Sequence, residues 1–251
     1  MSGHSKWSTI KRKKGKEDAK RGQIFTKLMR EVTSAARIGG GDPAGNPRLR
    51  HAIEAARAQN MPLANIERAI KKGTGELEGE AYEEVTYEGY GPAGVAILVQ
   101  SLTNNKNRTV AEIRHLFNKH NGSLGETGCV GWIFEKKGIF EIDRNKVTEE
   151  KMMEIALEFG AEDIVVEDDT YQIKTDFQSF DRAKLHLSDC GLQCLLAEIA
   201  MVPKMTVKVQ GKEAEQTIRL IENLEELEDV QHVYANFDIE DKEMLQLAIS
   251  V

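Results

Sequence analysis

The first 30 residues concentrate side chains of the kind that bind phosphate. Lysine and arginine neutralise phosphate groups and release their counterions, and a nearby aromatic ring can stack on an unpaired base. The cationic residues of this segment and its tryptophan are Lys6, Trp7, Lys11, Arg12, Lys13, Lys14, Lys16, Lys20, Arg21, Lys27 and Arg30. The alternative is a solvated leader whose tryptophan packs on the helices that follow.

Two further features favour the phosphate-binding interpretation. Helical spacing places Lys27, Arg30 and Arg37 on one side of the first expected helix, so the basic surface continues beyond the arm. A second basic patch in residues 104–122 contains Lys106, Arg108, Arg114 and Lys119, with Glu112 as its one acidic residue. A leader alone explains neither feature, so we predict that the residues of the first segment bind nucleic acid together with Lys106, Arg108 and Arg114.

Charge is divided unevenly along the chain. Residues 1–78 contain 17 lysines and arginines and 8 acidic residues. The rest of the chain contains 17 lysines and arginines and 33 acidic residues, so the formal net charge of the whole chain is -7. A basic module followed by acidic ones indicates that one part of the protein meets a polyanion.

Other chemistry finds little support. The glycines of GYGPAG, residues 89–94, resemble a dinucleotide-binding pattern, but a strand follows where that motif needs a helix, so we predict a turn between strands. His186, Cys190 and Cys194 are spaced like metal ligands, but Gly191 interrupts the helix and no second ligand pair lies nearby. The expected protein has no catalytic residues, metal, cofactor or small-molecule substrate.

The expected location is the cytoplasm. No stretch reaches the roughly 18 apolar residues that a membrane span needs, and no apolar segment of a secretory signal follows the first charges. The three cysteines are few and odd in number, as suits a reducing compartment.

The elements that carry the basic residues begin with three helices. The first presents an apolar stripe from Ile24 to Ala36. A second starts with Asn46 as its N-cap and Pro47 in its first turn, and a third starts near Pro62, buries Leu63 and ends with Gly73 as its C-cap. Residues 1–78 are therefore predicted to form a basic arm and a three-helix domain.

Strands dominate from residue 79 onward. Residues 135–204 alternate as βαββαβ, the ferredoxin-like plan, and residues 205–251 add a βαβ unit. We expect this last unit to pair with 79–134, where the capping-box spacing of Thr109 and Glu112 starts a helix. The predicted fold class is α+β with three domains: 1–78, the discontinuous 79–134 plus 205–251, and the inserted 135–204.

Long motifs in the chain resemble the YebC/PmpR family, which includes the mitochondrial translational activator of cytochrome c oxidase subunit I. The resemblance runs nearly end to end. It is carried by GHSKW (3–7), AKRGQIFTKL (19–28), GGGDPAGNPRLRHAI (39–53), NIERAIKKGTG (65–75), YEGYGPAGVA (87–96), NRTVAEIRH (107–115), GSLGETGCVGW (122–132) and DVQHVYANF (229–237). One departure is local, because Leu63 and Ala64 stand where the family usually has a Lys-Asp pair.

The resemblance implies three domains, no catalysis and two alternative roles. Bacterial members are described as cytoplasmic DNA-binding transcriptional regulators, which is our main prediction and makes duplex DNA the partner. The alternative is a ribosome-associated translation factor that binds ribosomal or transfer RNA and relieves stalling at proline-rich stretches. No recognition helix with side chains aimed at base edges stands out, which favours RNA. A third hypothesis, small-molecule sensing by the ferredoxin-like domain, has no supporting motif.

Overall fold

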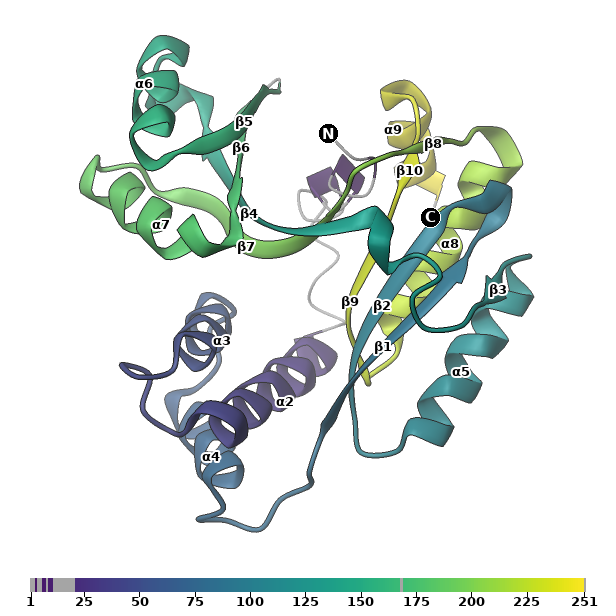
Figure 1. The fold of residues 1–251 in the computed structure, drawn as a ribbon, viewed down its shortest axis with the longest axis horizontal. Coiled ribbons are helices and arrows are strands. Elements are labelled where there is room, and N and C mark those ends of the chain that lie inside the picture. The colour runs from purple at the N-terminus through teal and green to yellow at the C-terminus, as the bar shows by residue number, and fades with distance from the viewer. Residues whose placement is uncertain (1–2, 4–5, 8, 11–20, 168, 251) are drawn as a thin grey trace. The chain divides into compact units, whose positions relative to one another are not determined.

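The chain folds into two compact units, shown in Figure 1. The computed structural model describes residues 3, 6–7, 9–10, 21–167 and 169–250. One unit contains Trp132–Met205 and the other contains Gly3–Gly131 with Thr206–Val251. The fold is α+β with an N-terminal helical region and two sheet-containing domains, as predicted.

Three helices form the helical region: α2 (Arg21–Gly39), α3 (Pro47–Ala58) and α4 (Leu63–Thr74). They enclose their own apolar core, which includes Val32, Leu49 and Ile66. The predicted start of α3 is confirmed, because the Asn46 side chain accepts a hydrogen bond from the Leu49 N–H and Pro47 occupies the first turn. Asn46 also donates to the carbonyls of Ala35 and Gly40, which joins the end of α2 to the start of α3.

Two expectations for α4 were wrong. The helix continues past Gly73, and the left-handed C-cap is Gly75, with φ of 85°. Gly73 faces α2 instead, where an added Cβ would lie 2.5 Å from the Thr33 carbonyl oxygen. Leu63 is 56% exposed rather than buried, because it lies at the solvent-facing start of the helix.

The larger unit also contains an antiparallel sheet in the order β3-β1-β2-β9. Its strands are β1 (Glu83–Tyr90), β2 (Ala96–Thr103), β3 (Ser123–Leu124) and β9 (Val230–Ala235). Helices α5 (Lys106–Lys119) and α8 (Gly211–Glu226) pack on one face, where Phe117 and Ile218 meet Ile97 and Val233. Strand β9 follows the unit Trp132–Met205 in sequence yet pairs with β2, so this sheet contains strands from both sides of that unit.

Short elements complete this unit. Strands β8 (Val207–Lys208) and β10 (Phe237–Asp238) form a parallel pair, and α9 (Asp241–Ser250) follows. The GYGPAG segment is a turn between β1 and β2, as predicted, with a short 3-10 turn at Pro92–Gly94. Helix α5 begins three residues before the predicted Thr109, because the Asn105 side chain caps it by accepting from the Arg108 N–H.

The unit Trp132–Met205 has the predicted ferredoxin-like plan. Its elements are β4 (Phe134–Asp143), α6 (Glu149–Phe159), β5 (Ala161–Val166), β6 (Thr170–Asp176), α7 (Phe180–Asp189) and β7 (Cys194–Pro203). The antiparallel sheet has the order β5-β6-β4-β7, and both helices cover one face. Phe140 on β4 and Phe180 on α7 stack in the core with ring centroids 5.0 Å apart.

Candidate nucleic-acid interface

Most of the basic arm lies outside the part of the chain that the structure describes. This holds for six of the predicted phosphate-binding residues, namely Lys11, Arg12, Lys13, Lys14, Lys16 and Lys20. Arg21 is the first residue of α2, and its side chain is also outside the described part. Their assignment to the interface therefore stays a prediction.

The described residues of the arm pack on the sheet-containing part of their unit. Gly3, Lys6, Trp7, Thr9 and Ile10 are helical. Trp7 is only 3% exposed and belongs to the core beneath the sheet, and Lys6 Nζ lies 2.9 Å from Asp241 Oδ1 on α9. A base stacked on Trp7 would require this segment to leave the core.

Two predicted phosphate-binding arginines converge on one buried carboxylate, Asp229, in the turn before β9. Arg30 Nη1 on α2 lies 2.6 Å from Asp229 Oδ1, and Arg108 Nη2 on α5 lies 2.7 Å from Oδ2. The hydroxyls of Thr109 and Thr103 donate to the same Oδ2 over 2.6 and 3.1 Å. The Asp229 side chain is 4% exposed and that of Arg30 is 11% exposed.

This network determines the ionisation of Asp229. Burial alone would raise the pKa of the carboxyl, but hydrogen bonds from Arg108 and Thr109 and the charge of Arg30 lower it below its usual value. Asp229 is therefore ionised at neutral pH, and both arginines already have an anionic partner. Local sequence patterns could not reveal this, because Arg30 and Asp229 are 199 positions apart.

The remaining described members of the predicted interface differ in their contacts. Lys27 Nζ donates to the Glu225 carbonyl oxygen over 2.5 Å, and Lys106 Nζ lies 2.5 Å from Glu83 Oε2. Arg114 on α5 is exposed and has no hydrogen-bond or ion-pair partner among the described residues. Lys119, at the end of the same helix, is also exposed to solvent.

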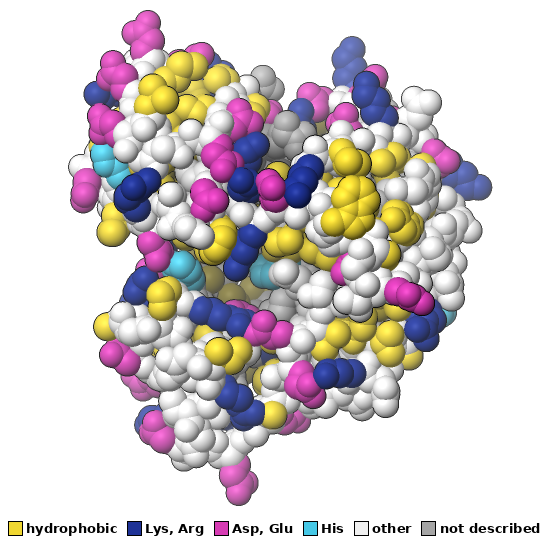
Figure 2. Space-filling view, in the orientation of Figure 1, with side chains coloured by type: hydrophobic (Ala, Val, Ile, Leu, Met, Phe, Trp, Pro, Cys, Tyr) yellow, Lys and Arg dark blue, Asp and Glu magenta, His cyan; other side chains and the backbone are white. Residues whose placement is uncertain are grey.

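The helical region offers further exposed cations that the predicted interface did not include. Without an ion-pair partner in the described part of the chain are Arg37 on α2, Arg57 on α3, and Arg68 and Lys71 on α4. On the face of this region seen at the lower left of Figure 2, basic side chains lie among acidic ones. The positive charge at the ends of α2 and α4 was visible in the sequence, but its exposure depends on how the helices pack.

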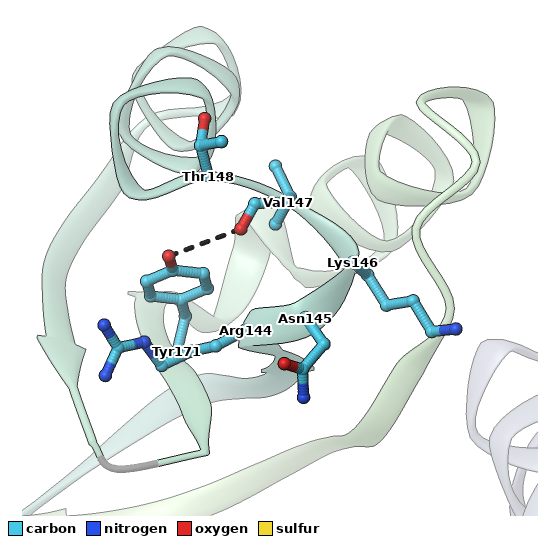
Figure 3. Close-up of a pocket in the computed structure, with 6 residues that line it drawn as sticks. All are labelled: Arg144, Asn145, Lys146, Val147, Thr148 and Tyr171. Carbon is cyan, nitrogen blue, oxygen red and sulfur yellow. Dashed lines mark hydrogen bonds between the residues drawn. The ribbon is translucent and has the colours of Figure 1, made fainter.

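A shallow hollow in the ferredoxin-like unit is lined by cationic and polar groups, shown in Figure 3. Its residues are Arg144, Asn145, Lys146, Val147, Thr148 and Tyr171. Most polar groups here are used internally: Arg144 donates to the Glu167 carbonyl, Asn145 donates to Asp143, and the Tyr171 hydroxyl donates to the Val147 carbonyl. The hollow therefore leaves few donors for an anionic ligand.

The residues spaced like metal ligands are not brought together as a site. His186 Nε2 lies 2.9 Å from Glu158 Oε2, Cys190 ends α7, and Cys194 begins β7. Within the described ranges no group of three or more histidines, cysteines or carboxylates could hold a metal ion. No helix in those ranges is long and apolar enough to cross a membrane.

Known proteins resemble this chain over nearly its whole length. It is 59% identical over 249 residues to a "Probable transcriptional regulatory protein" of Syntrophus aciditrophicus, covering 99% of this chain and 100% of the relative. A relative in Geobacter sulfurreducens with the same description is 56% identical over 247 residues, covering 98% and 100%. The crystal structure of a conserved hypothetical protein from Aquifex aeolicus superposes with a TM-score of 0.82 at 49% identity, over 89% of this chain and 93% of that one.

Two family profiles together match most of the chain. The one described as "TACO1/YebC protein N-terminal domain" matches residues 5–76, and the one described as "TACO1/YebC second and third domain" matches residues 82–237. The chain belongs to the TACO1/YebC family.

Proposed function

We propose that this protein is a non-enzymatic regulator that binds nucleic acid, with duplex DNA as the partner in a role in transcription. The relatives in Syntrophus and Geobacter are described as probable transcriptional regulatory proteins. The observation that carries the proposal is the concentration of positive charge in residues 1–78, which hold 17 lysines and arginines and 8 acidic residues in an acidic protein. The protein would meet duplex DNA in the cytoplasm, and the cytoplasm stays our prediction for the location of the protein.

The proposed interface combines the arm with exposed cations of the helices. Arg114, Arg37, Arg57, Arg68 and Lys71 are exposed and have no acidic partner among the described residues. Lysine and arginine side chains of this kind contact phosphates, and each contact adds to the dependence of binding on salt. Arg30 and Arg108 contribute only when they exchange Asp229 for a phosphate.

One observation favours RNA as a second candidate partner. In the turn-linked pair α3 and α4, the exposed residues in the first turn of α4 are Leu63 and Ala64, and neither side chain can hydrogen-bond to a base edge. Reading base edges in the major groove usually requires Arg, Asn or Gln at such positions. Contacts to phosphates without base readout suit ribosomal or transfer RNA as well as DNA, in a role in translation.

The test measures binding to three ligands across a salt series: promoter duplex, random duplex and structured RNA. The change of Lys11, Arg12, Lys13 and Lys14 to alanine should reduce the slope of log affinity against log salt by up to about 3–4, and Arg114→Ala by about 1. Lys151→Ala is a matched control, because this exposed lysine on α6 pairs with Glu154 and lies outside the proposed interface.

The three ligands also separate the two roles. Preference for promoter over random duplex would support the transcriptional role, whereas equal duplex affinities with tighter RNA binding and co-sedimentation with ribosomes would support the translational one. Failure to bind any of the three at low salt would overturn the proposed function.

A further inference from the structure

The helical region contacts the rest of its unit through a polar joint. Lys27 and Arg30 on α2 reach the end of α8 and the turn that follows it, where Lys27 Nζ donates to the Glu225 carbonyl and Arg30 Nη1 donates to the Glu228 carbonyl over 2.7 Å. Arg30 also pairs with Asp229 Oδ1 at 2.6 Å and with Glu228 Oε2 at 3.2 Å. A single arginine therefore makes three of these four contacts.

Apolar packing does not run through this joint. The core of the helical region and the core beneath the β3-β1-β2-β9 sheet share no residue among those described. A second polar contact strengthens the connection, because Arg48 on α3 pairs with Glu31 on α2 and with Glu84 on β1. Salt screens the more exposed Arg48–Glu84 pair, whereas the nearly buried Arg30–Asp229 pair is screened much less and is opposed mainly by an anion that binds Arg30 directly.

The two sides of the joint differ in how firmly they are held. Asp229 keeps hydrogen bonds to Arg108, Thr109 and Thr103, all from its own sheet domain, when Arg30 is absent. Arg30 has less support on its own side: its guanidinium lies over the Tyr82 ring, 5.3 Å from the centroid, and its buried Nε has no hydrogen-bond partner among the described residues. The Asp229 carboxylate is therefore held in place by its own domain, and Arg30 is the side chain that can dissociate from it.

We propose that the Arg30–Asp229 pair is a latch that a polyanion opens by competing for Arg30. A phosphate accepts two parallel hydrogen bonds from a guanidinium, as the carboxylate does, and carries the charge needed to replace it. Opening frees Arg30 and Lys27 for phosphate and releases the helical region from the turn before β9. A polyanion shifts the equilibrium because it binds the open state more tightly than the closed one. This inference rests on the proposed function.

The test measures the distance between α4 and α8 in the full chain. Two dyes are attached through non-natural amino acids at Glu67 and Lys212, both exposed positions outside the joint. Single-molecule energy transfer should show one narrow distance distribution in the wild type at about 0.05 M salt, with little broadening toward 1 M because the pair is nearly buried. Arg30→Gln should show the broad distribution at low salt, because it removes the charge from the moving side and leaves the other partners of Asp229 in place.

A matched control removes a different ion pair. Asp163→Asn breaks the pairing with Lys174 in the ferredoxin-like unit and should keep the narrow distribution. A narrow distribution in Arg30→Gln would overturn the latch.

Addition of nucleic acid tests the trigger. Random duplex DNA or structured RNA, with binding followed by anisotropy, should convert the wild-type distribution to that of Arg30→Gln. Binding with the narrow distribution unchanged would overturn the latch as a nucleic-acid switch. Absence of binding would overturn the proposed function and the polyanion trigger together, while Arg30→Gln still decides whether the pair holds the joint.

Discussion

The backbone N–H of Val130 donates a 2.7 Å hydrogen bond to Oε2 of Glu88, a nearly buried carboxylate on β1. The N–H groups of Gly131 and Gly128 donate to the same carboxylate over 2.6 and 2.8 Å. Burial would raise the pKa of Glu88, but these three backbone donors lower it, so the group stays ionised. One side chain thus fixes the loop that leads from β3 toward the ferredoxin-like unit.

Glu88→Gln should loosen this loop and destabilise the fold by about 1–3 kcal/mol, because an amide has one acceptor oxygen and places N–H groups against backbone donors. Urea unfolding would measure the loss, and hydrogen exchange should show faster exchange at Gly128 and Val130. Glu126→Gln is the matched control, since Glu126 lies exposed in the same loop. Equal behaviour of the two variants would contradict the anchoring role.

Asp229→Asn should destabilise the protein at neutral pH by about 3–5 kcal/mol, the usual cost of breaking a buried ion pair by removing one partner. The variant leaves Arg30 and Arg108 without their shared carboxylate. Asp163→Asn removes an exposed pair and should cost about 0–1 kcal/mol. Urea unfolding compares them, and a loss of similar size in both would show that burial of the network does not matter.

The effect of Asp229→Asn should also depend on pH. The pKa of Asp229 in the folded protein lies below the usual 3.8. A lowered carboxyl pKa gives stability that is fully present above about pH 5 and is lost as pH falls through the folded value. The difference between wild type and variant should therefore be constant from pH 7 to about 5 and shrink below pH 4. A difference independent of pH would mean that the carboxylate charge is not responsible.

Gly73→Ala should destabilise the helical region although alanine is the better helix former. An added Cβ would lie 2.5 Å from the Thr33 carbonyl oxygen and 2.7 Å from the Ala36 Cβ, so α2 and α4 would have to separate. We expect a loss of about 1–3 kcal/mol in thermal or urea unfolding. Gly22→Ala, with no neighbouring atom within 4 Å of the added Cβ, should be neutral or stabilising.

Asn46→Asp should fail to replace asparagine even though the two are equally good N-caps in general. The aspartate can still accept from the Leu49 N–H, but it cannot donate to the Ala35 and Gly40 carbonyls that lie 2.8 and 2.9 Å from Nδ2. Both Asn46→Asp and Asn46→Ala should cost about 1–3 kcal/mol in unfolding experiments. Full stability in the aspartate variant would show that capping alone explains this residue.

Features of the fold that depend on residues close together in the sequence could be predicted from the sequence alone. Asn46 and Pro47 identify the start of α3 because capping involves residues within one turn. The βαββαβ order could be predicted because apolar residues recur about every two residues in a strand and about every 3.6 residues in a helix. Gly73 was misassigned as a C-cap because its close approach to Thr33 depends on how α2 and α4 pack, which the local pattern does not contain.

The candidate interface was harder to predict for the same reason. Lysines and arginines in sequence identify where positive charge is, but not which of them an acidic residue already holds. Arg30 and Arg108 lie in basic segments typical of phosphate binding, yet both pair with Asp229, which is far from them in the sequence. Arg114 shows the opposite case, because it lies exposed and without a partner among the described residues.

The insertion of the ferredoxin-like unit imposes an order on folding during synthesis. Strand β2 can pair with β1 early, but its other neighbour, β9, emerges from the ribosome only after Trp132–Met205 has emerged. Until then β2 is an open sheet edge with apolar Ile97 and Val99, the kind of edge that joins other chains. A chain that ends at Met205 should therefore self-associate, so premature termination in this gene would yield an aggregating product rather than a working fragment.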